Sequence, residues 1–126
     1  MIGLNRKVLL VYGFNEEEKS ILKKLVMENK IPSFKCIDKS MATNSLEYIL
    51  CDVDNSKYDG ELPEEKVVLF NSCKDKEVTK AISAIKENVS MDVIFAMVTE
   101  TSVKWSFKDL LEHLIKEREW FKNNSK

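Results

Sequence analysis

Glycine, proline, histidine and net charge are all scarce in this sequence. The chain of 126 residues holds three glycines, two prolines and one histidine, and its 20 basic and 21 acidic side chains leave a net charge of −1. So few glycines and prolines favour regular elements joined by short loops over disorder. The balanced charge argues against nucleic-acid binding, which needs a basic excess gathered on one face.

The cysteines and the short apolar runs exclude further classes of protein. Cys36, Cys51 and Cys73 cannot all pair within one chain, and none of them has the C-x-x-C spacing of a zinc site. The apolar run near the start, residues 8–11, is far too short for a signal peptide or a membrane span. We therefore expect a cytoplasmic protein with no membrane contact, no metal and no cofactor.

Two successive parts of the chain carry the same order of predicted elements. Apolar runs predict strands at residues 7–12, 34–37, 66–70 and 93–98. Capped segments with apolar residues at helical spacing predict helices at about 15–29, 44–50, 78–89 and 106–121. We expect one domain, residues 1–126, with halves at about 7–50 and 66–121 joined by the acidic loop 52–65.

The halves also match in sequence, since Lys7 and Lys66 each begin a K-V-x-L segment. This indicates a duplicated strand–helix–strand–helix unit. Right-handed crossovers, with a two-fold axis parallel to the strands, predict an α/β fold. Its four-stranded, mainly parallel sheet has the order 2-1-3-4, with two helices on each face.

This strand order reverses between the strands at 7–12 and 66–70. In a parallel sheet their carboxyl ends would form a topological switch point, where ligands commonly bind. The residues that follow these two strand ends are Gly13, Phe14, Asn71, Ser72 and Cys73. If the protein has a pocket, we expect it at this switch point.

The second half contains an unusual turn. Residues 95–102 read F-A-M-V-T-E-T-S, and Trp105-Ser106 then leads into L-L-E-H-L at 110–114. Residues 66–121 thereby resemble a bacterial family of uncharacterised proteins, a domain of unknown function with a V-T-x-T-S-x-x-W-[S/T] turn. The first half has Lys39-Ser-Met-Ala at the equivalent place and no tryptophan. The resemblance implies a fold and a group, but no activity.

The turn residues Thr99, Thr101, Ser102 and Trp105 have two interpretations. Hydroxyls at the start of a helix could help its free N–H groups to hold a small anion. Alternatively, the hydroxyls cap the turn and Trp105 covers the edge of the sheet, which is the favoured interpretation. A reactive Cys73 is disfavoured, because the only histidine, His113, is expected on the outer flank of the last helix.

The strand at 93–98 is an edge strand in the predicted order, yet it has no charge or proline to protect it. The opposite edge strand carries Lys35. An unprotected apolar edge is often covered by a partner, so we expect a homodimer through this strand. The residues expected at the interface are Val93, Phe95, Met97, His113 and Trp120.

No acid/base pair, metal set or activated nucleophile is apparent in the sequence. The leading hypothesis is therefore a non-enzymatic binding or protein-interaction module. The alternative is an enzyme or sensor that binds a small anionic metabolite at the switch point or at the Thr99–Trp105 turn.

Overall fold

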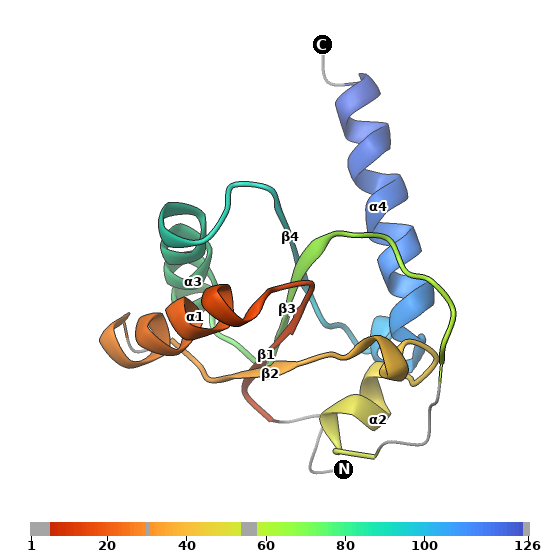
Figure 1. Ribbon diagram of the computed structural model, residues 1–126, viewed down its shortest axis with the longest axis horizontal. Helices are drawn as coiled ribbons and strands as arrows, with labels where there is room; N and C mark the ends of the chain where they lie inside the picture. Colours follow the sequence, from red (N-terminus) through yellow and green to blue (C-terminus); the bar gives the residue numbers. More distant parts are fainter. Residues whose placement is uncertain (1–5, 30, 54–57, 125–126) are drawn as a thin grey trace.

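The computed structural model describes residues 6–29, 31–53 and 58–124, which form a four-stranded sheet covered by helices (Figure 1). The strands are β1 (Val8–Tyr12), β2 (Phe34–Cys36), β3 (Lys66–Asn71) and β4 (Val93–Met97). The α-helices are α1 (Glu16–Asn29), α2 (Leu46–Leu50), α3 (Asp75–Asn88) and α4 (Phe107–Asn124). Two 3-10 turns, η2 (Lys39–Met41) and η3 (Ser102–Lys104), precede α2 and α4. Part of the predicted acidic loop, residues 54–57, lies outside the described residues.

The strand order β2-β1-β3-β4 is the predicted one, but the strand directions differ from the prediction. β1 and β2 are parallel, as are β3 and β4, whereas β1 and β3 are antiparallel, with Leu10 opposite Leu69. The sheet is therefore mixed and mostly parallel. The predicted switch point is wrong, because the carboxyl ends of two antiparallel strands lie at opposite ends of the sheet.

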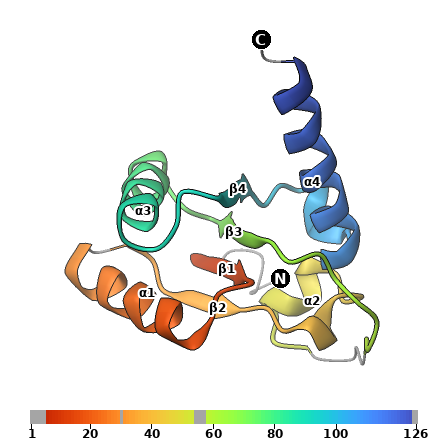
Figure 2. The same cartoon turned by 45° about the horizontal axis from the view of Figure 1, so that its top comes forward.

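Two helices cover each face of the sheet, as predicted (Figure 2). α1 and α3 pack together on one face, over a core that includes Leu9 and Phe70. α2 and α4 cover the other face, over a core that includes Leu10 and Phe107. An axis parallel to the strands would have put α1 and α3 on opposite faces. In the structure α1 and α3 instead lie on the same face, and β1 and β3 run in opposite directions.

Contacts between the two halves occur in matched pairs. Lys7 forms an ion pair with Glu77 at 3.0 Å, and Lys66, which begins the other K-V-x-L segment, forms one with Glu18 at 3.4 Å. The starts of α2 and α4 also pair with each other, through Ser45 and Ser106. The backbone hydrogen bonds there run from Leu46 N–H to the Trp105 carbonyl (3.1 Å) and from Phe107 N–H to the Asn44 carbonyl (3.0 Å).

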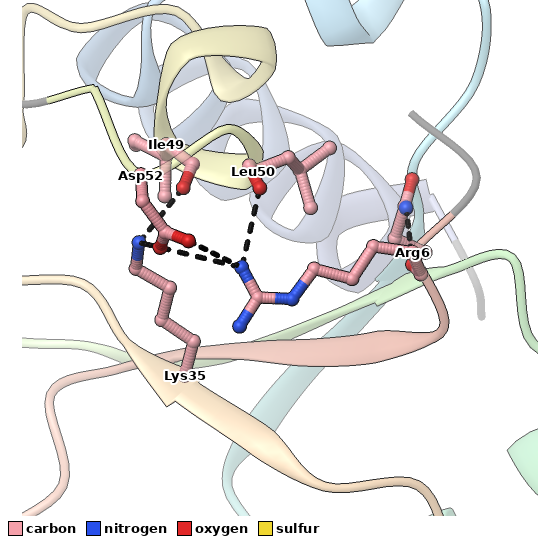
Figure 3. Close-up of polar contacts among 6 residues, drawn as sticks. Arg6, Lys35, Ile49, Leu50 and Asp52 are labelled. Atoms are coloured by element: carbon pink, nitrogen blue, oxygen red, sulfur yellow. Dashed lines mark hydrogen bonds and ion pairs between the residues drawn. The ribbon is translucent and has the colours of Figure 1, made fainter. Parts of the chain in front are cut away.

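The edge strand β2 is tied to the end of α2 by charged side chains (Figure 3). Lys35 Nζ donates to the Ile49 carbonyl at 2.9 Å, and the Arg6 guanidinium donates to the Leu50 carbonyl at 3.2 Å. Asp52 accepts hydrogen bonds from both cations. Positive charge at these carbonyls complements the negative end of the helix. Lys35, the charged residue in the otherwise apolar strand β2, therefore also stabilises the end of α2.

Candidate functional site

β4 is the other edge of the sheet and consists of apolar residues alone, V-I-F-A-M. Its side chains alternate between the two cores: Phe95 packs on the α3 side, and Ile94 and Ala96 pack on the α4 side. None of the five residues is fully buried, and Met97 is 45% exposed. β4 thus presents a half-exposed apolar strand with no strand paired to its outer side among the described residues.

A groove of about 290 Å³ runs beside β4, between the strand, the following turn and α4. It combines residues that the sequence singled out as site candidates with residues that it did not. The predicted residues are Met97, Thr99, Thr101, Ser102 and Trp105, with His113 on the helix side. The residues added by the structure are Ala96, Leu110, Leu114 and Glu117. The three of these residues on α4 had a signal in the sequence, because helical spacing connects positions 110, 113, 114 and 117.

The wall of this groove on α4 continues as an aromatic stripe. The His113 ring meets the Trp105 ring edge-on, with centroids 5.3 Å apart, and His113 Nε2 lies 3.2 Å from a Glu117 carboxylate oxygen. One turn further on, Trp120 and Phe121 contact each other edge-on and are each 60% exposed. This last part of α4 extends past the sheet (Figure 1). We call β4 with His113, Glu117, Trp120 and Phe121 the β4–α4 surface.

The hydroxyls of the turn bond to the turn itself. Thr99 N–H donates to Ser102 Oγ at 2.9 Å, and Ser102 N–H donates to Thr99 Oγ1 at 3.0 Å. The two hydroxyl oxygens also lie 3.1 Å apart. This reciprocal arrangement is the capping role that the favoured interpretation assigned to these side chains.

The N-terminus of α4 has its first donors occupied by other parts of the chain. Phe107 N–H donates to the Asn44 carbonyl at 3.0 Å, and Lys108 N–H donates to the Ala42 carbonyl at 2.8 Å. Asp109 N–H donates to Ser106 Oγ at 3.2 Å. An anion at a helix start is held by such N–H groups when they are free. Here they join the two halves of the protein and cap the helix.

The residues of the predicted switch point are divided between the two ends of the sheet. Gly13 lies against Glu65 and Lys66, at the start of β3. Asn71, Ser72 and Cys73 instead lie beside the end of β4, in a hollow of about 440 Å³ that also includes Thr99. The structure therefore brings Asn71 and Ser72 close to the turn and leaves Gly13 and Phe14 away from them.

Cys73 has the properties of a structural thiol. Burial raises the pKa of this thiol, and the nearby Glu77 carboxylate raises it further. Its Sγ lies 3.4 Å from the Asn71 carbonyl, so the proton has an acceptor within the turn. A raised pKa keeps the group protonated at neutral pH and does not favour a nucleophilic thiolate.

Arg118 anchors α4 just before the exposed aromatic pair. Its guanidinium donates two hydrogen bonds, each 2.7 Å long, to the two carboxylate oxygens of Glu65, which precedes β3. These hydrogen bonds hold the pKa of Glu65 below its usual value, and the same pair raises the pKa of Arg118. This contact between distant residues has no local pattern in the sequence. It fixes the position of the helical part of the β4–α4 surface.

Glu65→Gln is expected to destabilise the protein in a pH-dependent way. The pKa of Glu65 is lower in the folded state, so its contribution is present above its unfolded pKa of about 4.3 and is lost as pH falls through the folded pKa. We expect the variant to lose on the order of 1 kcal/mol at pH 7 and less at pH 3, measured by urea unfolding. Glu119→Gln, which removes only a 3.3 Å contact to the same arginine, is the control and should change little. An equal loss for Glu65→Gln at both pH values would contradict this account.

Neither a metal centre nor a membrane span is found in the described part of the chain. No three His, Cys, Asp or Glu side chains within residues 6–29, 31–53 and 58–124 are grouped so that they could hold a metal ion. No helix in those ranges is long and apolar enough to cross a membrane.

Comparison with known protein families places the second half of the chain beside a known domain. Residues 66–121, which begin at β3 and include most of α4, match the model of DUF3783, a domain of unknown function. No curated protein and no solved structure matches the chain. The second half of this protein is therefore similar to a domain of unknown function.

Proposed function

We propose that this protein is a non-enzymatic protein-interaction module that binds its partner through the β4–α4 surface. The observation that carries the proposal is the uncharged free edge of β4, which continues into the aromatic stripe of α4. Natural edge strands usually carry charges, proline or a covering element, because a bare edge pairs with other strands. β2 follows this rule through Lys35, whereas β4 does not.

The rival proposal, an anion-binding enzyme or sensor, has less support. The first N–H groups of α4 donate within the protein, and the Thr99 and Ser102 hydroxyls bond within the turn. Cys73, with its raised pKa, supports no nucleophilic step. The groove beside β4 is largely apolar, and the aromatic side chains of Trp120 and Phe121 continue its wall on α4. Such a surface suits a protein partner better than a phosphate.

The proposal extends to the origin and location of the chain. We propose that it arose by duplication of one strand–helix–strand–helix unit, so that its first half packs on the second as a partner subunit would. The matched ion pairs, Lys7–Glu77 and Lys66–Glu18, support this, as does the domain match to the second half alone. We also propose a cytoplasmic location, which suits three free, half-buried cysteines.

Site-specific photo-crosslinking in cells tests the proposed function. A photoreactive amino acid replaces Met97 or Phe121 on the surface, or Met27 on α1 as a control that is 82% exposed. We expect adducts from the Met97 and Phe121 positions and none from Met27, because only the first two lie on the binding surface. Adducts no more abundant at Met97 and Phe121 than at Met27 would contradict the proposal.

A further inference from the structure

The partner that best fits the β4–α4 surface is a second copy of this chain, and we infer that the two β4 strands pair antiparallel about Phe95. This inference rests on the proposed function and specifies its partner. The product would be one continuous sheet through two molecules, with strand order 2-1-3-4-4-3-1-2. Three features of β4 carry the inference: its backbone direction, the sizes of its side chains, and its lack of charge.

The side to which each backbone N–H and C=O group of β4 points determines which of these groups can bind a second strand. Val98 N–H donates to the Phe70 carbonyl, so the backbone N–H of Val98 points toward β3. Successive residues of a strand turn their N–H and C=O groups to opposite sides. Ile94 and Ala96 therefore face β3, and Val93, Phe95 and Met97 direct their backbone groups to the free side. Antiparallel pairing about Phe95 places Phe95 opposite its own copy, and Val93 opposite Met97, in the hydrogen-bonded positions.

The side chains suit this register on both faces. Residues opposite each other in antiparallel strands project from the same face, so the large Ile94 lies opposite the small Ala96 of the second copy. Ala96 borders the groove whose other walls include Leu110 and Leu114, and this space can take the isoleucine. All 5 residues of β4 are paired in this register, and a shift in either direction leaves some of them unpaired.

Two copies of β4 can pair without charge repulsion, because no residue from Val93 to Met97 is ionisable. Pairing places no like charges opposite each other, which would be destabilising. The same internal pattern already exists once in the fold, where β1 and β3 pair antiparallel about Leu10 and Leu69. The proposed contact thus repeats a geometry that this sequence forms within one chain.

A charge-complementation experiment tests the register and the partner together. Met97→Lys and Val93→Glu are each studied by sedimentation velocity, alone and as an equimolar mixture of full-length proteins. The wild type should be dimeric, and each variant alone should dimerise at least tenfold more weakly, because it places a charge opposite an apolar residue. In the mixture the introduced lysine faces the introduced glutamate at one pair of positions, and Val93 faces Met97 at the other. Heterodimers should therefore form at least tenfold more tightly than either homodimer.

One control and one replacement pair keep the outcome unambiguous. Met27→Lys, on exposed α1, should sediment like the wild type. The reversed pair, Met97→Glu with Val93→Lys, replaces the first pair if Val93→Glu does not fold by circular dichroism.

Each negative outcome has one meaning. A wild type that stays monomeric at high micromolar concentration, or a mixture no tighter than its components, would overturn the inference. If crosslinks at Met97 and Phe121 then yield adducts of a mass other than twice that of the chain, the proposed function stands without the second copy. If they yield no adducts, both proposals fall.

Discussion

Replacing Gly13 with alanine is expected to lower the free energy of unfolding by about 3 kcal/mol or more, which corresponds to a fall of about 10 °C in Tm. Gly13 has a φ of 87°, in the region that side-chain-bearing residues rarely adopt. A Cβ at this position would lie 2.0 Å from the Glu65 carbonyl oxygen, which belongs to the backbone entering β3. The clash can be relieved only by moving one of the two central strands.

Gly60→Ala is the matched control for this substitution. A Cβ at Gly60 would meet the hydroxyl of Tyr58 at 2.4 Å, but that atom is the far end of a side chain and can move. We expect a loss below about 1 kcal/mol for this variant, measured by the same thermal and urea unfolding. Equal losses for the two alanine variants would show that the close approach of Gly13 to Glu65 has no energetic importance.

Truncating Phe107 to alanine is expected to cost about 3 to 5 kcal/mol. Phe107 is fully buried at the start of α4, and its ring lies 5.0 Å from the ring of Tyr12, centroid to centroid. The substitution removes the side chain that joins α4 to the end of β1, and the rigid surroundings would leave a cavity. Urea unfolding followed by tryptophan fluorescence measures the loss.

Phe121→Ala removes the same atoms from an exposed position and separates stability from binding. Phe121 is 60% exposed, so we expect its truncation to change the free energy of unfolding by less than about 0.5 kcal/mol. It should nevertheless weaken self-association, because the residue belongs to the β4–α4 surface. A large loss of stability from Phe121→Ala, or none from Phe107→Ala, would contradict the assignment of the core.

The sequence predicted the strand order but not the direction of the second half, for a physical reason. The handedness rule acts within each strand–helix–strand unit, so β1–α1–β2 and β3–α3–β4 each follow from it. It does not constrain how two such units join. The connection between Leu50 and Lys66 is long enough for β3 to run either way beside β1. The prediction of a switch point assumed that β3 runs parallel to β1. Because the two strands are antiparallel, this prediction was wrong, and Gly13 and Asn71 lie at opposite ends of the sheet.

The candidate surface was partly predictable, because its strand carries a local signal and its helix depends on tertiary contacts. The bare edge of β4 follows from the absence of charge at residues 93–98 once the strand order is known. His113 and Trp120 were placed on the outer flank of α4 by helical spacing. Glu117 was missed although it lies one helical turn after His113. The anchoring pair of Arg118 with Glu65 was missed because a contact between distant positions leaves no periodic pattern.

Residue-resolved hydrogen exchange in β4 is the most direct test of the central claim that this edge is a binding surface for a second copy. The Ala96 N–H faces β3 and serves as an internal reference, and the Phe95 N–H faces the free side. In a concentrated sample of the wild type we predict that the Phe95 amide exchanges as slowly as that of Ala96, and that dilution accelerates Phe95 selectively. A Phe95 amide that exchanges rapidly at every concentration, while Ala96 remains protected, would contradict the account.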